Sequence, residues 1–242
     1  MSVSKIVALT NVGLLASAIE RAQARPMGLP GLVAMYGASG LGKSVGAAFA
    51  ANRYRAYYVE CRDTWSKKAF LQAILREMSI LPAVTLSNMV DQVAEQLSRS
   101  TRPLIIDDVQ YLLDKAVANV LTDIYNASQG TMVLIGEERV PTSLAKLERL
   151  HNRVLEWVPA QPATLEDMQA LAAASYPKLR IDAALLEDLR RAVNGCLRRV
   201  AVNLYRIYSE AEAMGLDSVD LPQWQQLSRG WFTGEAPVRR RA

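Results

Sequence analysis

The chain has 242 residues, half of them apolar, and its 28 lysines and arginines outnumber its 24 acidic residues to give a formal charge of +4. A chain of this length and apolar content can bury a substantial core, either as one large domain or as a domain with a small appendage. The mild basic excess permits binding to nucleic acid but does not demand it.

The cysteine usage and the distribution of apolar residues limit the class of protein further. Cys61 and Cys196 stand alone, without metal-ligand spacing, so we expect two reduced thiols. No apolar run approaches the length of a membrane span, and the N-terminus lacks a charged segment followed by an apolar one. These patterns predict a cytoplasmic protein that does not associate with a membrane.

Up to about residue 160, apolar runs with the length of strands alternate with segments of helical periodicity. An N-terminal helical pattern ends at Pro26. Strands are predicted at 32–36, 56–61, 104–106, 131–135 and 154–158, and helices at 44–53, 70–78, 86–97, 112–127 and from about 141. Strands that alternate with helices predict an α/β fold, with a parallel sheet sandwiched by helices.

The pattern changes after about residue 160. Thr164-Leu165-Glu166-Asp167 has the spacing of a capping box that opens a helix. Two more helices are predicted at 182–193 and 196–214, with no strand between them. The expected parts are an N-terminal helical segment (1–30), an α/β domain (31–160), an all-helical domain (161–226) and a basic tail (227–242) that ends in Arg239-Arg240-Arg241 and is expected to fray.

The stretch 37-GASGLGKS-44 lies between a predicted strand and a predicted helix. It fits G-x-x-x-x-G-K-[ST], in which backbone N–H groups curl around phosphate oxygens and the helix adds its positive N-terminal end. We expect Lys43 to reach the β- and γ-phosphates of ATP, and the Ser44 hydroxyl to ligate Mg²⁺. A glycine-rich turn with a chance lysine is the alternative. The predicted nucleotide-binding residues are Gly37, Ala38, Ser39, Gly40, Leu41, Gly42, Lys43, Ser44 and Val45.

Two acidic residues follow the short apolar strand Leu104-Ile105-Ile106. Asp107 is predicted to hold Mg²⁺ through water, and Asp108 to orient the water that attacks the γ-phosphate. The alternative is structural, because aspartates at the end of a strand also form turns well. Aspartate at the second position is shorter than glutamate, so we expect slow hydrolysis.

A further strand is expected between the phosphate-loop strand and the acidic strand, and 131-TMVLIG-136 fits that position. Glu137 at its tip would sense the γ-phosphate. Asn or Thr is more common at this position in such folds, and a surface acid without a catalytic role is the alternative.

Together these residues resemble an AAA+ ATPase, from about Leu14 to Trp224. The resemblance implies a P-loop NTPase with a five-stranded parallel sheet and a small helical lid domain. It also implies a finger arginine that reaches the ATP of a neighbouring subunit, for which Arg153 is the first candidate and Arg149 the second. In 195-GCLRR-199 it points to Arg198 as a lid sensor. Each arginine could instead be a solvated helix charge.

Within AAA+ proteins, the chain is similar to the transposition helpers, which include the Mu-like phage B protein, transposon target-selection ATPases and IstB-type proteins. The similarity rests on 101-TRPLIIDDVQYLLDK-115, on a long helix-loop-helix between strands two and three, and on the compact size. It implies ATP-dependent, non-specific binding to duplex DNA, self-association into a homo-oligomer or helical filament, and recruitment or activation of a transposase in the bacterial host cytoplasm. Hydrolysis stimulated by DNA or the partner would drive release. The chain departs from the Mu protein because no N-terminal helix-turn-helix domain is evident.

The segment 61-CRDTWSKKAF-70 is the expected DNA contact. It offers Arg62, Thr64, Lys67 and Lys68 where a strand gives way to a helix. Hydroxyl groups and backbone N–H groups at a helix start hold phosphates, and cations add charge, so binding would be independent of sequence and sensitive to salt. The alternative is an N-capped helix with ordinary surface lysines.

Two other functions remain open. A replication initiator or helicase loader would share the Asp-Asp-Val-Gln sequence, bind a protein partner and favour single strands. A metabolic kinase would use the same phosphate loop as a monomer and would have a pocket for a small acceptor.

Overall fold

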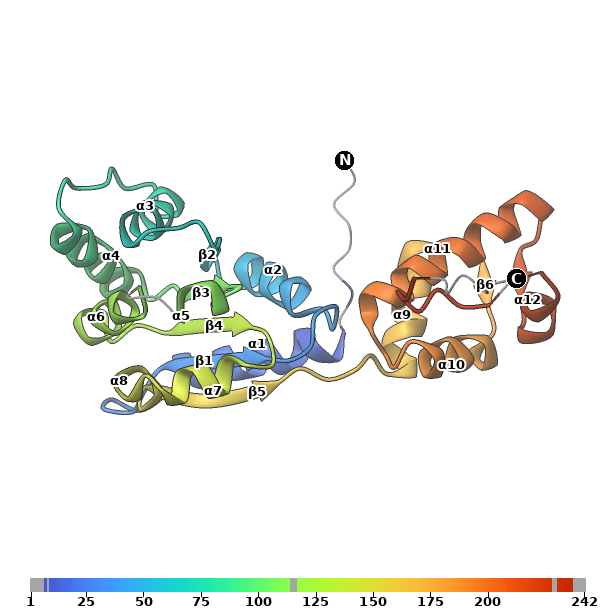
Figure 1. Ribbon diagram of the computed structural model, residues 1–242, viewed down its shortest axis with the longest axis horizontal. Helices are drawn as coiled ribbons and strands as arrows, with labels where there is room; N and C mark the ends of the chain where they lie inside the picture. The colour runs from blue at the N-terminus through green and yellow to red at the C-terminus, as the bar shows by residue number, and fades with distance from the viewer. Residues whose placement is uncertain (1–6, 8, 114–116, 228–229, 237–242) are drawn as a thin grey trace. The chain divides into compact units, whose positions relative to one another are not determined.

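The computed structural model describes residues 7, 9–113, 117–227 and 230–236. The chain divides into two compact units (Figure 1). The larger unit comprises Asn11–Ser39 and Lys43–Ala160, and the smaller unit is formed mainly by the chain from Gln161 onwards. Across the described ranges, no helix combines the length and the apolar character that crossing a bilayer requires.

The larger unit is built on a five-stranded sheet with the strand order β2-β3-β4-β1-β5. All neighbouring strands in this sheet are parallel. The strands are β1 (Leu32–Tyr36), β2 (Tyr57–Glu60), β3 (Leu104–Asp107), β4 (Met132–Gly136) and β5 (Val154–Pro159). Because the strands are parallel, the residues that follow β1, β3 and β4 meet at one edge of the sheet, where ligands bind in open α/β folds.

Helices cover both faces of this sheet (Figure 1). Successive strand residues point to opposite faces. The helices are α1 (Thr10–Gln23), α2 (Lys43–Arg53), α3 (Lys67–Glu77), α4 (Leu86–Ser100), α5 (Gln110–Leu113), α6 (Ala118–Ser128), α7 (Val140–Ala145) and α8 (Glu148–His151). Leu104 and Ile106 belong to the core that contains residues of α3, α4 and α6, whereas Ile105 belongs to the core that contains residues of α1 and α2. The predicted parallel sheet between two helical layers is confirmed.

One predicted helix of the larger unit is wrong in its extent. The expectation of a single helix at 112–127 is replaced by α5 and α6, and residues 114–116 between them lie outside the described residues. The chain turns at once after β3 because Asp108 has a left-handed backbone, with φ +52°. The Val109 N–H then donates to the Ile135 carbonyl at 2.9 Å, and a short helical turn begins at Gln110.

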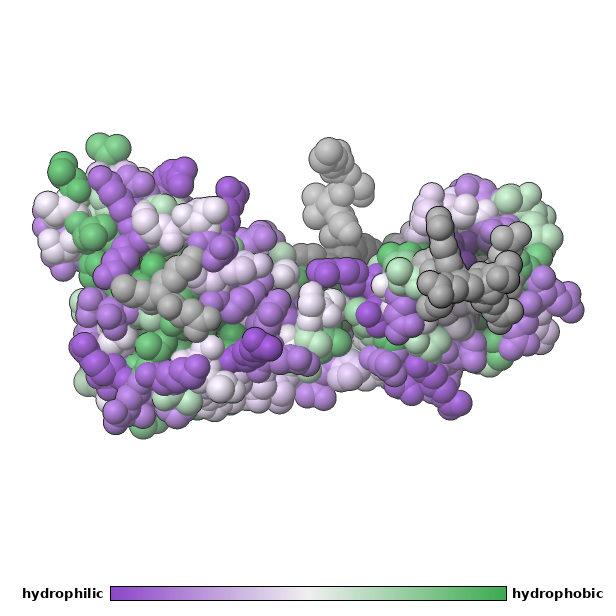
Figure 2. All heavy atoms as spheres, viewed as in Figure 1, coloured by the Kyte–Doolittle hydropathy of each residue, from purple (hydrophilic) through white to green (hydrophobic). Residues whose placement is uncertain are grey.

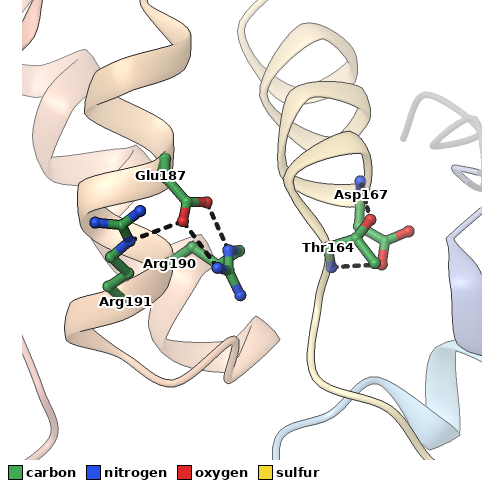
Figure 3. A network of polar contacts seen from close by, with 5 residues as sticks. All are labelled: Thr164, Asp167, Glu187, Arg190 and Arg191. Carbon is green, nitrogen blue, oxygen red and sulfur yellow. Dashed lines mark hydrogen bonds and ion pairs between the residues drawn. The ribbon is translucent and has the colours of Figure 1, made fainter.

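The smaller unit consists of α9 (Leu165–Ser175), α10 (Ala183–Ala192), α11 (Leu197–Met214) and α12 (Leu221–Leu227). The predicted capping box is present: Thr164 Oγ1 accepts from the Asp167 N–H at 3.1 Å, and Asp167 Oδ2 accepts from the Thr164 N–H at 3.0 Å (Figure 3). Side-chain caps of this kind satisfy N–H groups that have no partner within the helix.

The smaller unit also contains extended structure that the sequence pattern does not reveal. The two-residue strands β6 (Arg180–Ile181) and β7 (Ser218–Val219) pair in parallel. Both segments are too short for the alternation of apolar and polar residues that identifies a strand. The expectation of an all-helical domain is therefore corrected by this small pair of strands.

Part of the predicted basic tail is held against the smaller unit. The ring of Trp231 stacks on Trp224 with centroids 5.1 Å apart, and its indole Nε1 donates to Asp188 Oδ2 at 2.8 Å. The backbone N–H of Phe232 donates to Asn203 Oδ1 at 2.9 Å. Arg239, Arg240 and Arg241 lie outside the described residues.

The connection between α3 and α4 carries exposed apolar side chains. Leu81 and Val84 are each 89% exposed, and Leu86 is 43% exposed. Figure 2 shows apolar atoms at the surface over this part of the larger unit.

Both cysteines are free thiols, as the sequence predicts. Cys61 is buried and Cys196 is half-buried.

Candidate nucleotide-binding site

The phosphate loop connects the end of β1 at Tyr36 to the start of α2 at Lys43. Gly40 and Gly42 have φ angles of +87° and +88°, a backbone region that is unfavourable for residues with a Cβ atom. A Cβ atom at Gly37 would lie 3.0 Å from the Cβ atom of Ala160. The glycines are thus needed both for the path of the loop and for the space around it.

Lys43 lies at the first position of α2, with its side chain folded onto the loop. Its Nζ atom donates to the carbonyls of Gly37 at 2.8 Å and Ala38 at 2.9 Å. Burial lowers the pKa of Lys43, and the negative charges of Asp107 and Glu137 oppose that change. The ammonium group is therefore bound by the loop carbonyls, and the charges of the acids at the ends of β3 and β4 act on it.

Asp107 is the last residue of β3 and is only 2% exposed. Its carboxylate accepts hydrogen bonds from the Asp108 backbone N–H at 2.9 Å and from the Tyr58 hydroxyl at 3.1 Å. Burial raises the pKa of Asp107, and the Ser44 hydroxyl, the Asp108 N–H and the Tyr58 hydroxyl oppose the rise. The phosphate loop therefore contributes to the electrostatic surroundings of the acidic strand.

The residues at this position fit a nucleotide with Mg²⁺. Ser44 and Asp107 provide a hydroxyl and a carboxylate, and the hydroxyl lies close enough to the carboxylate to lower its pKa. Mg²⁺ prefers such hard oxygen ligands and retains several waters alongside one or two protein groups. The left-handed glycines leave the backbone of the loop open for close approach of phosphate oxygens.

Asp108 and Glu137 are linked through a residue that the sequence analysis did not select. Gln110 Nε2 donates to Asp108 Oδ1 at 3.1 Å, and Gln110 Oε1 accepts from the Glu137 backbone N–H at 3.3 Å. Glu137 is exposed at the end of β4. One amide side chain therefore connects the candidate water-orienting acid to the candidate sensor position.

The last predicted residue of the loop segment, Val45, is 41% exposed on the first turn of α2. Within the larger unit, the structure brings Lys43, Asp107, Asp108 and Glu137 to the carboxyl edge of the sheet, at the end of β3, directly after β3 and β4, and at the start of the helix that follows β1. Their roles stay predictions, since the geometry shows proximity alone.

The finger candidates lie at the opposite edge of the sheet. Arg153 directly precedes β5, and its carbonyl accepts from the N–H of Leu32 at the start of β1. The phosphate loop follows the other end of β1. Its Nε atom donates to Asn126 Oδ1 at 3.2 Å, and the guanidinium lies 6.0 Å from the ring centroid of Tyr125. Arg153 also lines a cavity of about 260 Å³. Arg149 is exposed on α8. Neither arginine belongs to the phosphate site of its own chain.

Arg198 is the second residue of α11, in the smaller unit. Gly195, with a φ angle of +62°, forms the turn that precedes this helix. A Cβ atom at Gly195 would lie 2.9 Å from the backbone nitrogen of Ala163, so the turn requires glycine. The sensor role of Arg198 stays a prediction.

The predicted DNA contacts lie where β2 leads into α3. Ser66 caps α3 by accepting from the Ala69 N–H at 3.2 Å, and Lys67 and Lys68 occupy the first two helical positions. Arg62, Thr64 and Lys68 are exposed, and Lys67 is half-buried. Two lysines at the start of a helix add to its positive dipole end, where a negative residue is usually favoured. This local excess of positive charge is suited to a phosphate backbone.

Tyr58 and Gln110 are the two residues of the site that sequence reasoning missed. Burial and the charge of Asp107 raise the pKa of Tyr58, so its hydroxyl stays protonated and donates to the carboxylate. The only signal for Tyr58 is its place in the strand beside the acidic strand. Gln110 has a closer signal, because it lies two residues after Asp108.

Comparison with known families supports the same fold. Residues 27–144 match the family model described as AAA domain. No curated protein sequence matches the chain.

Solved structures are similar over most of the chain. The Aeropyrum pernix ORC2 protein, in ADPNP–ADP complexes, is 15% identical with a TM-score of 0.67, and the match covers 95% of this chain and 68% of that one. The Thermotoga maritima RuvB Holliday junction branch migration motor is 19% identical with a TM-score of 0.61, covering 93% and 72%. The Aeropyrum pernix ORC1 protein in complex with DNA is 17% identical with a TM-score of 0.60, covering 93% and 66%. The chain therefore has an AAA-domain P-loop ATPase fold similar to those of ORC proteins and RuvB.

Proposed function

We propose that this protein is an ATPase that binds duplex DNA without regard to sequence, self-associates on it when loaded with ATP, and recruits or activates a transposase. The observation that carries the nucleotide part is the placement of the buried Asp107 beside the phosphate loop, where the Ser44 hydroxyl lowers its pKa and its charge acts on Lys43. This placement brings together a hydroxyl and a carboxylate that can serve Mg²⁺–ATP, the carboxylate through water. The match of residues 27–144 to an AAA domain supports the same chemistry.

Each residue of the site has a distinct role in hydrolysis. Lys43 binds the β- and γ-phosphates; Ser44 would hold the metal directly and Asp107 through water, and the metal when bound would neutralise charge on the phosphates. Asp108 orients the attacking water and accepts its proton, while Gln110 keeps the Asp108 carboxylate in place. Glu137 contacts the γ-phosphate side of the site through its position after β4. Arg198 acts as the lid sensor.

Assembly depends on Arg153, with Arg149 as the second candidate. Because Arg153 lies at the edge of the sheet opposite the phosphate loop, it can serve only the nucleotide of another subunit. ATP then stabilises the oligomer because it binds at a site that two subunits share, and hydrolysis favours release.

DNA binding is assigned to Arg62, Thr64, Lys67 and Lys68 at the β2–α3 connection. Contacts to phosphates from exposed cations and a helix start carry no information about base sequence.

The transposase part of the proposal rests on the resemblance of residues 101–115 to transposition helpers. The fold likeness to an ORC1 protein in complex with DNA favours a second candidate, a replication initiator or helicase loader.

The test is retention of random-sequence duplex by the full chain with ATP, with ADP and without nucleotide, followed by electron microscopy of the ATP sample. We expect ATP-dependent retention and oligomers on the duplex, and loss of both in Lys43→Ala. Equal retention with and without ATP would contradict the proposal. A preference for single strands would favour the initiator or loader instead.

The proposed DNA contacts are tested in the same assay by comparing two double-lysine variants. Replacing Lys67 and Lys68 with Ala should weaken duplex binding and reduce the slope of log K against log salt by about two, since each lost phosphate contact removes roughly 0.9. Lys146→Ala combined with Lys178→Ala removes the same charge from exposed positions elsewhere and should leave the slope almost unchanged. Equal effects of the two pairs would show that only net charge matters.

A further inference from the structure

We propose that Tyr58 is a positioning residue for the magnesium-bound nucleotide, acting through its hydrogen bond to Asp107. This inference rests on the proposed ATPase function. It assigns a role to a residue of β2, a strand that supplies none of the phosphate-binding or water-orienting residues described above.

The position of Tyr58 follows from the pairing of β2 with β3. The two strands are parallel, with Tyr58 opposite Ile105 and Glu60 opposite Asp107. The ring of Tyr58 packs against the core that contains Ile105 and residues of α1 and α2. From there the hydroxyl group donates to Asp107 Oδ2 at 3.1 Å.

The Asp107 carboxylate is held on both of its oxygens. Oδ1 accepts from the Asp108 backbone N–H at 2.9 Å, and Oδ2 accepts from Tyr58. The Ser44 hydroxyl lies near the same carboxylate and lowers its pKa. An ionised carboxylate has about four acceptor positions, so these donors leave room for a water of a bound metal while they restrict rotation of the group.

The hydrogen bond from the Tyr58 hydroxyl to Asp107 is expected to contribute more free energy than a hydrogen bond between two neutral groups. Asp107 is 2% exposed, so bulk water cannot replace a lost donor freely. A hydrogen bond to a charged, buried acceptor contributes more than one between neutral groups, and leaving the acceptor without it incurs a desolvation cost. Removing the hydroxyl should therefore weaken the hold of the site on Mg²⁺, while the contacts of Lys43 and the loop with phosphate remain.

The test compares Tyr58→Phe with Tyr54→Phe in the full chain. Tyr54 packs against the same core, but its hydroxyl donates to Glu20 Oε1 at 2.8 Å and to the Ala16 carbonyl at 3.2 Å, away from Asp107. Both variants keep the aromatic ring, and thermal unfolding reports whether each is folded. The affinity for a fluorescent ATP analogue is measured first in EDTA and then as Mg²⁺ is added.

We expect Tyr58→Phe to bind the analogue in EDTA as the wild type does, and to need about tenfold more Mg²⁺ for half of the metal-dependent gain in affinity. Hydrolysis should show the same shift in Mg²⁺ dependence, with much of kcat recovered at saturating Mg²⁺. Tyr54→Phe should match the wild type in both measurements.

Three results would overturn the inference, and they have different meanings. An unchanged Mg²⁺ requirement in Tyr58→Phe would show that the hydroxyl does not position the metal ligand. An equal loss of affinity in EDTA and in Mg²⁺ would assign Tyr58 a purely structural role. If the wild type itself gains no affinity from Mg²⁺, the proposed ATPase function fails, and this inference fails with it.

Discussion

Asp107 and Asp108 are neighbours in the chain, but their surroundings differ. Asp107 ends β3 with its side chain buried and its carboxylate accepting from the Asp108 N–H and the Tyr58 hydroxyl. Asp108 is half-buried and has a left-handed backbone with φ +52°, a conformation that aspartate tolerates better than most residues. The two carboxylates have different side-chain partners, Tyr58 for Asp107 and Gln110 for Asp108. This difference suits the separate roles proposed for them, one acid toward the metal and the other toward the water.

Replacing Gln110 with Ala removes the amide that holds Asp108. We expect kcat for ATP hydrolysis to fall by roughly 10- to 100-fold, because a hydrogen bond to a charged group contributes about 1.5–3 kcal/mol. Nucleotide affinity should stay unchanged, since Gln110 bonds neither to the loop nor to Lys43. Steady-state hydrolysis and fluorescent-nucleotide binding measure the two quantities.

The matched control for this variant is Gln225→Ala on α12, where the side chain is exposed. It should change neither quantity. A Gln110→Ala enzyme with normal kcat, or one whose affinity falls in step with kcat, would contradict the assigned role.

Helices α9 and α10 show how local contacts stabilise the smaller unit. The capping box closes the start of α9, and on α10 the Glu187 carboxylate pairs with Arg190 at 2.6 Å and Arg191 at 2.9 Å (Figure 3). These pairs have the i,i+3 and i,i+4 spacings that bring side chains together on a helix surface. The hydrogen bonds from the two arginines lower the pKa of Glu187 to about 2.

The pKa of Glu187 predicts how the stability of the smaller unit depends on pH. The folded-state pKa lies below the ordinary value of 4.5, so the ionised side chain stabilises the folded state at higher pH. This contribution is complete above pH 4.5 and is lost as the pH falls toward about 2. Glu187→Gln should therefore lower Tm near neutral pH, by a small amount that salt reduces, and the difference from the wild type should shrink on acidification.

Thermal unfolding at a series of pH values measures this effect. Glu210→Gln on α11 provides the comparison, because Glu210 is also an exposed helical acid. Its Tm difference from the wild type should vary less with pH. A Glu187→Gln difference that stays constant down to pH values near 2 would show that the arginine pairs do not contribute.

The sheet as a whole separates the parts of the proposed shared site. The phosphate loop and Asp107 lie at the carboxyl edge, whereas Arg153 precedes β5 at the other edge. Within one chain these groups lie apart, so the proposed finger role of Arg153 requires a second subunit. Arg153 is accessible for this role beside a cavity of about 260 Å³ lined also by Tyr125 and Gln129.

Mixing two inactive variants tests this arrangement. Arg153→Ala should bind nucleotide but hydrolyse it slowly, and Lys43→Ala should neither bind nor hydrolyse. Combined on duplex DNA, they should regain part of the wild-type rate, because Lys43→Ala subunits supply Arg153 to intact phosphate loops. Repeating the experiment with Arg149→Ala in place of Arg153→Ala identifies the finger. A mixture no faster than its components would contradict a role in trans for Arg153.

Features that depend on short stretches of chain were predictable from the sequence. The phosphate loop is contiguous from Gly37 to Ser44, and its conformation follows from glycines and from the strand and helix on either side. The alternation of strands and helices up to residue 160 and the capping box at Thr164 are equally local, because periodicity and capping act within a few residues. These patterns were sufficient for the fold class, and they located the phosphate loop whose roles stay predictions.

Contacts between distant segments required the folded chain. Tyr58 and Asp107 are 49 residues apart, and Gln110 and Glu137 are 27 apart. Whether such side chains meet depends on strand order, on register and on the turn at Asp108, and a shift of one residue in register would point Tyr58 to the other face of the sheet. For the same reason the pair of strands β6 and β7 was missed, since two residues carry no periodic signal and become a strand only when a partner lies alongside.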